Sequence, residues 1–263
     1  VKAPFAEELL ARVASVVDPA KIEVVVSNHS EPDHSGGLPR VLEAVRPELV
    51  VASANGVKAL DAHFGLDGRV TAVGDGQELS LGNMTLTFAE TKMCHWPDSM
   101  VSYLHEDALL FSQDAFGMHL AANERFADEM DHAVVRGEAA KYYANILLPL
   151  GAFVQKALAK LQALKLPLRI VAPDHGPIWR TEQDIREIVS SYERWVRQER
   201  TIKAVVVYDT MWQSTARMAR AVGEGLTAGG AAVKLVRMDA SHRSDVATEI
   251  LDAGALVVGS PTL

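Results

Sequence analysis

The sequence is poor in cysteine, in basic charge and in long apolar runs, and each shortage excludes a class of protein. Only Cys94 is present among the 263 residues, so an internal disulfide framework and a cysteine-cluster metal site are both excluded. The formal net charge of -8 repels nucleic acids and anionic membrane surfaces at long range. No apolar run approaches the roughly 18 residues of a membrane span. A metal site in this chain must therefore use histidine and carboxylate side chains.

Targeting and terminal signals are also missing. The N-terminus lacks the charged segment and apolar core of a signal peptide, and a single cysteine fits a reducing compartment, so we expect a cytoplasmic location. Val1 leads directly into a helix-like segment without an initiator methionine, and the chain stops two residues after Ser260-Pro261. These ends predict a fragment that lacks both termini and that aggregates or is unstable alone.

Short apolar runs and turn residues predict a first αβ unit. Strands are predicted at residues 22–26, 49–52, 69–73, 84–88, 100–105, 108–111 and 168–171. Helices are predicted at residues 39–44, 57–64, 138–164 with a break at Pro149, and 182–197.

A charged stretch at residues 198–201 predicts a linker, which divides the chain into domains 1–199 and 200–263. After it, strand-like AVVVY, AVKLV and ALVVG alternate with two helix-like segments. This βαβαβ order predicts a parallel, doubly wound sheet.

Metal-binding residue types cluster after the first predicted strand. His29, Glu31, Asp33 and His34 lie within six residues, in an H-x-E-x-D-H pattern. Three further candidates follow other predicted strands: His95, Asp114 and His175. Four imidazoles and three carboxylates exceed the needs of one divalent ion but suit two ions that share a bridging carboxylate.

A lone histidine or aspartate at a strand end is more often a capping or solvated group. The four-residue cluster changes this expectation, because a binuclear site needs further ligands from elsewhere in the chain. The other histidines lack such a context and are interpreted as surface or core residues: His63, His105, His119, His132 and His242.

The segment DTMWQST lies between a predicted strand and a predicted helix. Its hydroxyls and backbone N–H groups could bind a phosphate at the helix N-terminus, although Ser214 and Thr215 could equally be plain N-caps. The candidate flavin-binding residues are Thr210, Met211, Trp212, Gln213, Ser214 and Thr215, together with Ser260, Pro261 and Thr262 at the end of the third strand of this unit.

The motifs HSEPDHSGG, MCHWPDSM, FSQDAFG and APDHG resemble those of the flavodiiron proteins, a branch of the metallo-β-lactamase superfamily. YDTMWQST and VVGSPT resemble their flavodoxin-like domain. The resemblance implies an N-terminally truncated αββα sandwich followed by the first part of a flavodoxin-like doubly wound sheet. Glu31 stands where the zinc hydrolases of the superfamily typically have histidine, and a carboxylate-rich site suits non-haem iron.

The resemblance also implies roles and cofactors. His29, Glu31 and His95 would hold the iron nearer to the flavin, and Asp33, His34 and His175 would hold the other iron. Asp114 would bridge the two ions, and FMN would be the second cofactor. A tyrosine approaches the iron site in this family; we choose Tyr143, although Tyr142 and Tyr143 could both simply pack on a helix face.

The implied activity is reduction of dioxygen to water, of nitric oxide to nitrous oxide, or of both. A rubredoxin-like electron donor and a head-to-tail homodimer are the implied partners. One alternative is a zinc-dependent hydrolase of the same superfamily, against which Glu31 and the flavodoxin-like segment argue. Another is a binding module that keeps FMN without catalysis.

Overall fold

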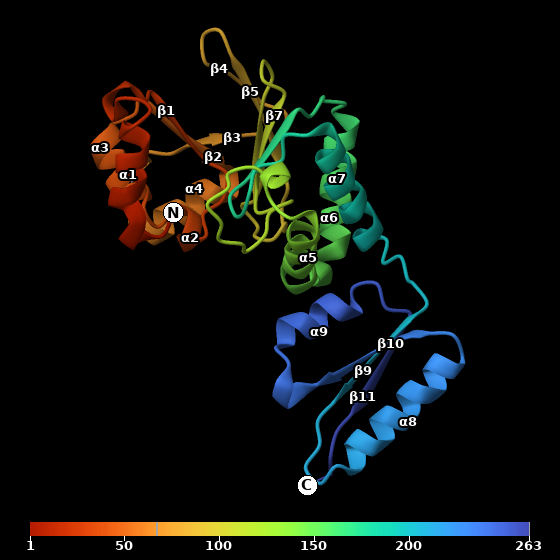
Figure 1. The fold of residues 1–263 in the computed structure, drawn as a ribbon. Helices are drawn as coiled ribbons and strands as arrows, with labels where there is room; N and C mark the ends of the chain where they lie inside the picture. Colours follow the sequence, from red (N-terminus) through yellow and green to blue (C-terminus); the bar gives the residue numbers. More distant parts are fainter. Residues whose placement is uncertain (67, 263) are drawn as a thin grey trace.

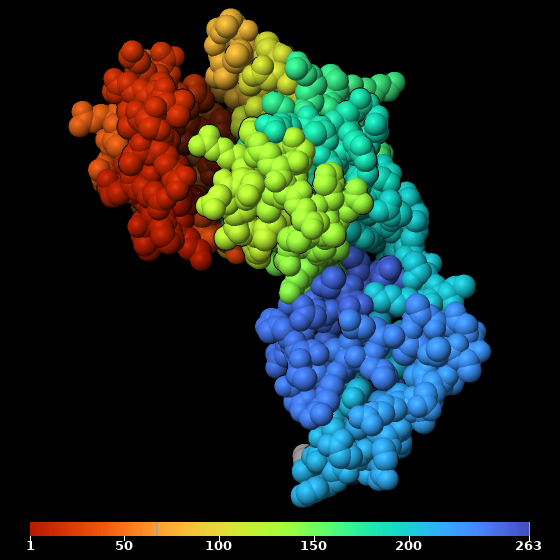
Figure 2. All heavy atoms as spheres, in the orientation of Figure 1, coloured from red at the N-terminus to blue at the C-terminus, as the bar shows by residue number. Residues whose placement is uncertain are grey.

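The computed structural model describes residues 1–66 and 68–262, which form two masses connected by one irregular stretch of the chain (Figures 1 and 2). In these residues, no helix has the length and apolar character needed to cross a membrane. The larger mass contains two sheets and the smaller one contains a third.

The first sheet is parallel, in the order β1-β2-β3. Its strands are β1 (Val24–Ser27), β2 (Leu49–Ser53) and β3 (Thr71–Val73). The helices near it are α1 (Ala6–Ala14), α2 (Pro32–Ser35), α3 (Leu38–Val45) and α4 (Ala54–Phe64).

The second sheet has the order β4-β5-β6-β7-β8 and is antiparallel except between β7 and β8. Its strands are β4 (Glu78–Ser80), β5 (Thr85–Glu90), β6 (Met100–Leu104), β7 (Leu109–Gln113) and β8 (Ile170–Pro173). Three helices lie on one side of it (Figure 1): α5 (His132–Tyr142), α6 (Gly151–Ala163) and α7 (Glu182–Val196).

Alternation along β2 explains how these layers stack. Val50 and Ala52 pack against α3 and α4, whereas Val51 faces the second sheet and packs with Phe88 and Met100. The opposite face of the second sheet is covered by α5, α6 and α7 in a further core. Because β2 buries both faces, its residues are apolar at nearly every position. The result is the predicted αββα order.

The predicted elements of this unit are present, with boundaries that move by a few residues. The short strand β4 was not predicted, because ELS carries too little apolar pattern. The helix predicted at 138–164 begins earlier, at His132, and is interrupted before Pro149 by a π-helical turn, Tyr143–Leu147, followed by a 3-10 turn, Leu148–Leu150. The other 3-10 turns are Ala3–Phe5, Pro19–Lys21, Ala127–Glu129 and Met238–Ala240.

The third sheet is parallel, as the βαβαβ pattern predicts, and its strands have the order β10-β9-β11. Its strands are β9 (Lys203–Tyr208), β10 (Ala232–Arg237) and β11 (Ala255–Gly259). The helices α8 (Ser214–Ala228) and α9 (Arg243–Ile250) cover opposite faces (Figure 1).

Helix α9 connects this unit to the larger mass. Nζ of Lys141 on α5 lies 2.7 Å from a carboxylate oxygen of Asp245 on α9. The side-chain amide of Asn145, in the π-helical turn, donates to the carbonyl of Ser244 at 3.1 Å. Leu251 belongs to the core that α5, α6 and α7 share with the second sheet. The two units therefore meet at the π-helical turn.

Candidate metal centre

Four strand ends carry the candidate metal ligands. His29 follows β1, His95 follows β5, Asp114 follows β7 and His175 follows β8. Glu31 is the N-cap of α2, and Pro32 begins that helix, which is a favoured position for proline because its missing N–H needs no partner there. Asp33 and His34 thus lie within a short helix, whereas all seven candidates were expected in strand-end turns.

Asp114 lies at the centre of these side chains. Its Oδ2 is 3.4 Å from Nε2 of His29 and 3.1 Å from Nε2 of His95. Its Oδ1 is 3.2 Å from Nε2 of His34 and 3.4 Å from Nε2 of His175. Each carboxylate oxygen therefore faces one pair of imidazoles.

The other two carboxylates complete the same two groups. Oε2 of Glu31 is 3.2 Å from Nε2 of both His29 and His95. Oδ2 of Asp33 is 3.3 Å from Nε2 of His175, and its Oδ1 is 3.5 Å from Nε2 of His34. The seven side chains thus form two halves, each with two imidazoles and one carboxylate, and Asp114 lies between the halves.

Unpartnered buried atoms mark this place as suited to cations. Both carboxylate oxygens of Asp114, Nε2 of His34 and Oδ1 of Asp33 are buried and have no hydrogen-bond partner among the described residues. Leaving buried polar atoms unpaired is costly unless a ligand satisfies them. The donor atoms are imidazole nitrogens and carboxylate oxygens, a set that fits two divalent ions such as iron.

The pKa values reflect the crowding of charge in the metal-free state. Burial alone would raise the pKa of Asp114, but the imidazoles of His34 and His95 outweigh it and hold the pKa far below its ordinary value. Burial alone would lower the pKa of His34, but Asp114 and Asp174 raise it to about 10. Metal ions would take the place of these protons, because histidine ligates only when its nitrogen is deprotonated.

Two carboxylates that were not predicted contact the outer nitrogens of the histidines. Oδ2 of Asp98 lies 3.4 Å from Nδ1 of His29 and accepts the backbone N–H of Ser30 at 2.6 Å. Oδ2 of Asp174 lies 3.0 Å from Nδ1 of His34. A carboxylate at Nδ1 keeps the proton there and leaves Nε2 free to bind a metal. The sequence signal was present, since Asp98 and Asp174 stand inside the quoted motifs HWPDSM and APDHG.

Buried Gln113 joins two of the ligand loops. Its Nε2 donates to the carbonyl of Cys94 at 2.5 Å, and its Oε1 accepts the N–H of Asp114 at 2.8 Å. Cys94 itself is buried. Gln113 therefore fixes the distance between the loops that carry His95 and Asp114.

The loop after Asp114 and the loop that carries His175 approach each other closely, and this approach depends on two glycines. A Cβ atom on Gly117 would lie 2.8 Å from the carbonyl oxygen of His175 and 3.1 Å from that of Asp114. Gly176 has φ of 81°, and a Cβ there would lie 2.7 Å from the side chain of Met118. Only residues without Cβ let these two loops come together.

The structure places Tyr142 nearer to the cluster than Tyr143. The ring centroid of Tyr142 is 6.5 Å from that of His175 and 4.9 Å from that of His119. Tyr143 points into the aromatic core, with ring centroids 5.0 Å from those of both Tyr192 and Trp195. Adjacent helical residues point about 100° apart, so only one of the two can face the metal centre.

His119 is also closer to the cluster than expected. Its ring centroid lies 5.1 Å from that of His175 and 4.9 Å from that of Tyr142. It lines, with His29, His34 and His175, a cavity of about 1210 Å³. Figure 2 shows a hollow between the N-terminal elements, in red, and the yellow-green elements. No strand precedes His119 directly, so its position could not be inferred from the pattern that found the other histidines.

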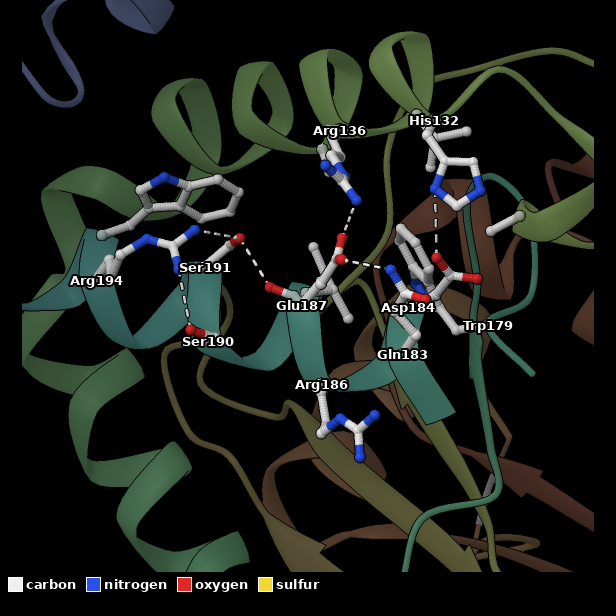
Figure 3. A pocket seen from close by; sticks show the side chains of 15 residues that line it. His132, Arg136, Trp179, Gln183, Asp184, Arg186, Glu187, Ser190, Ser191 and Arg194 are labelled. Atoms are coloured by element: carbon white, nitrogen blue, oxygen red, sulfur yellow. Dashed lines mark hydrogen bonds and ion pairs between the residues drawn. The ribbon is translucent and has the colours of Figure 1, made fainter. Parts of the chain in front are cut away.

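A second hollow, of about 660 Å³, lies between α5 and α7 (Figure 3). Its charged groups are engaged with neighbouring side chains. Arg136 pairs with Glu187, which also accepts from Gln183, and His132 lies 3.5 Å from Asp184. Arg186 pairs with Glu182, and Arg194 donates to the hydroxyls of Ser190 and Ser191. No buried polar side-chain atom of this lining lacks a partner among the described residues, so this hollow is a weaker candidate site than the cluster around Asp114.

The candidate flavin loops lie together at the carboxyl ends of β9 and β11 in the third sheet. The N–H of Asp209 donates to the carbonyl of Gly259 at 3.0 Å, so the loops after β9 and β11 are neighbours. The N-cap of α8 is Gln213, with φ of 66° and no side-chain capping bond, so neither Ser214 nor Thr215 is the plain N-cap considered as an alternative. Oγ1 of Thr210 is buried without a hydrogen-bond partner in the described part of the chain. These groups fit a phosphate at the N-terminus of α8.

The remaining candidate flavin residues are mostly exposed. Met211 is 52% exposed and Trp212 is 85% exposed, so both side chains face outward beside the loop. Ser260 and Thr262 are exposed, and Pro261 is partly buried. Large exposed apolar groups at a strand edge are suited to cover a flat ring.

Comparison with known proteins agrees with both halves of this architecture. A family model described as ODP family beta lactamase matches residues 3–176, and a flavodoxin model matches residues 206–263. The chain is 45% identical to a nitric oxide reductase of Moorella thermoacetica over 261 residues, covering 99% of this chain and 65% of the relative.

Solved structures show the same similarity. The rubredoxin oxygen:oxidoreductase of Desulfovibrio gigas superimposes with a TM-score of 0.97 at 43% identity, over 100% of this chain and 66% of the other. The flavodiiron protein of Giardia intestinalis superimposes with a TM-score of 0.95 at 35% identity, over 100% of this chain and 64% of the other. The chain spans about half to two thirds of the length of the curated relatives that it matches. By sequence and by fold, it belongs to the flavodiiron protein family.

Proposed function

We propose that the protein reduces a diatomic gas, dioxygen to water or nitric oxide to nitrous oxide, at a pair of iron ions supplied with electrons through FMN. One observation carries the proposal: each oxygen of Asp114 faces its own group of two imidazoles and one carboxylate. This is the arrangement that a bridging carboxylate makes between two ions.

The proposed ligands divide as the two halves do. His29, Glu31 and His95 hold the first ion. Asp33, His34 and His175 hold the second, and Asp114 bridges. Three carboxylates leave a pair of ferrous ions with a net charge of about +1 and a pair of ferric ions with about +3, so the site tolerates both oxidation states. When bound, the iron pair supplies redox chemistry to the gas, and FMN returns the electrons.

The protein's own residues position these groups. Asp98 and Asp174 hold the Nδ1 protons of His29 and His34, so the Nε2 atoms would be unprotonated and free to bind the metals. Burial and the nearby charge of Asp114 raise the pKa of Tyr142 far above 10, so its hydroxyl keeps its proton. We assign Tyr142, in place of Tyr143, as the hydrogen-bond donor beside the gas.

FMN is proposed to lie at the carboxyl ends of β9 and β11. Thr210, Ser214 and Thr215, with the backbone N–H groups at the start of α8, would hold its phosphate. Met211, Trp212, Gln213 and the loop Ser260, Pro261 and Thr262 would cover the flavin ring. The boundary between the iron domain and the flavin domain is placed between residues 199 and 200.

The partners follow from the names of the relatives. A rubredoxin-like protein is proposed as the electron donor, because a structural relative is named a rubredoxin oxygen:oxidoreductase. A head-to-tail homodimer, which would bring the flavin of one subunit to the iron pair of the other, and a cytoplasmic location complete the proposal.

The test uses the full-length protein expressed with both iron and zinc available. The proposal expects about two iron atoms and one FMN per chain, together with consumption of dioxygen or nitric oxide after reduction. A zinc-filled protein that hydrolyses esters or thioesters would overturn it in favour of the hydrolase alternative. An iron- and FMN-loaded protein that reacts with neither gas would identify a binding module.

A further inference from the structure

An apolar cavity lies on the helix side of the second sheet, away from the open cavity at the metal cluster. Its volume is about 170 Å³. Strand β7 and helices α6 and α7 enclose it, and Leu110, Phe116, Leu158, Leu161, Leu168 and Val189 line it. Gln162 and Lys165, both exposed, mark the end nearest to solvent.

A smaller cavity, of about 20 Å³, continues from the first toward the metal cluster. The two cavities share three wall residues: Phe116, Leu158 and Leu161. The smaller one is also lined by Cys94 and Ala115. Cys94 precedes His95 in the chain, and Ala115 follows Asp114. An almost unbroken apolar line thus leads from the surface at α6 to the residues beside two candidate ligands.

The walls decide what can occupy this line. Leu158 and Leu161 offer no hydrogen bond, and the buried hydroxyl of Tyr192 in the smaller cavity already accepts the N–H of Phe116 at 2.8 Å. The hydroxyl of Thr91 also lines the smaller cavity and has no hydrogen-bond partner among the described residues, but a single polar group is too few to hold a water molecule. A water molecule needs two to four polar partners, so cavities of this kind stay dry and bind apolar guests such as xenon. Ions and charged substrates are excluded for the same reason.

We propose that these two cavities bind small neutral gases and pass them to the metal cluster from the helix side. The inference rests on the proposed function, since dioxygen and nitric oxide are the gases that the iron pair would consume. The smaller cavity has room for about one small molecule, and passage past Phe116 and Leu158 requires side-chain rotations, which occur in picoseconds to nanoseconds at exposed sites and more slowly in cores.

Xenon tests the binding step independently of activity. The full-length protein loaded with iron and FMN is titrated with xenon and followed by ¹²⁹Xe NMR. Xenon is expected to bind the wild type, to bind severalfold more weakly to Leu161→Trp, which fills the shared wall, and to bind normally to Leu164→Trp. Leu164 lies on the same helix but is exposed and lines neither cavity. Absence of xenon binding in the wild type would overturn the proposal.

Gas kinetics test the passage. After reduction, Leu161→Trp is expected to show a severalfold higher KM for the gas with an unchanged kcat, iron content and flavin spectrum. Leu168→Trp, which would fill part of the larger cavity, is expected to act in the same direction should Leu161→Trp fold poorly. A variant that excludes xenon yet keeps the wild-type KM would show that the gas enters elsewhere. Fully loaded wild type that consumes neither gas would overturn the proposed function, and xenon binding alone would then decide whether the cavities hold apolar gases.

Discussion

Oδ2 of Asp98 lies 3.4 Å from Nδ1 of His29, and both side chains are almost completely buried. The same oxygen accepts the N–H of Ser30 at 2.6 Å, so Asp98 is held by the loop that it supports. Burial and these contacts act in opposite directions on the pKa of Asp98, and the contacts prevail and lower it. The charged carboxylate of Asp98 therefore orients the ring of His29 and is not itself a proposed metal ligand.

Asp98→Asn should therefore weaken metal binding without emptying the site. The amide keeps the volume and can still accept from Ser30, but it no longer stabilises the proton at Nδ1 of His29. Loss of such an outer partner typically costs about 10- to 100-fold in metal affinity. Iron retention during chelator competition measures the effect. Asp107→Asn, in the exposed turn between β6 and β7, is the control, and equal retention by both variants would contradict the role of Asp98.

Asp114→Asn should have a larger effect, because one change removes the charge shared by both halves of the cluster. We expect iron content to fall from about two atoms per chain to less than one, since each ion loses an anionic ligand. The metal content of purified protein is the measurement. Two tightly bound iron atoms in the variant would contradict a bridging role.

How far the sequence predicts this centre can be seen by comparing His29 with Asp98. His29 stands in a dense H-x-E-x-D-H cluster after a strand, and β-branched runs located that strand and most others within a few residues. Asp98 lies 69 positions away in a turn, and only the folded chain brings it to His29. Metal-capable residue types at strand ends were therefore found, whereas their supporting partners Asp98 and Gln113 were not.

The sequence also does not predict which side chain of a helix or loop faces the metal cluster. Tyr142 and Tyr143 are neighbours in a predicted helix and point about 100° apart, but only the folded chain shows that Tyr142 lies beside His175 and Tyr143 beside Tyr192. His119 shows the same limit for a loop, since its approach to His175 depends on the turn through Gly117.

Removing the hydroxyl from two buried tyrosines should change the free energy of unfolding differently. The hydroxyl of Tyr192 accepts the buried N–H of Phe116 at 2.8 Å, whereas the hydroxyl of Tyr143 is buried without a hydrogen-bond partner in the described structure. Tyr192→Phe should lower the free energy of unfolding by about 1–3 kcal/mol, because it leaves a buried donor unpaired. Tyr143→Phe should be neutral or stabilise by up to about 1 kcal/mol. Urea unfolding compares them, and destabilisation of the same size in both would refute the distinction.

The ion pair between Lys160 and Asp75 predicts a pH-dependent contribution to stability. Their charged atoms are 2.7 Å apart, and Lys160 also donates to the carbonyl of Glu90 at 2.8 Å. Burial would raise the pKa of Asp75, but Lys160 and the N–H of Glu90 outweigh it and lower the pKa below 3.8. The contribution is therefore full above about pH 4 and is lost as the pH falls through the lowered pKa.

Lys160→Met should accordingly lower the free energy of unfolding by about 0.5 kcal/mol at neutral pH, a small value because both side chains are partly exposed. The difference from wild type should shrink below about pH 3. Lys156→Met on the same helix is the control, because Nζ of Lys156 has no carboxylate partner among the described residues and lies 5.8 Å from the centroid of the Phe153 ring. Urea titrations at several pH values compare the two, and a difference that grows in acid would contradict the assignment.

Gly117 tests whether the close approach of two ligand loops is needed for metal binding. A Cβ atom there would lie 2.8 Å from the carbonyl oxygen of His175, a backbone atom that cannot rotate away. Gly117→Ala should therefore displace the His175 loop, destabilise the protein by about 1–3 kcal/mol and weaken binding of the second ion. Gly137→Ala is the matched control, because its Cβ would point into open space on α5. That change should stabilise the helix by about 0.5–1 kcal/mol. If Gly117→Ala kept both iron atoms and full stability in thermal unfolding, the loops would have room to separate, and the geometry around Asp114 would not depend on their contact.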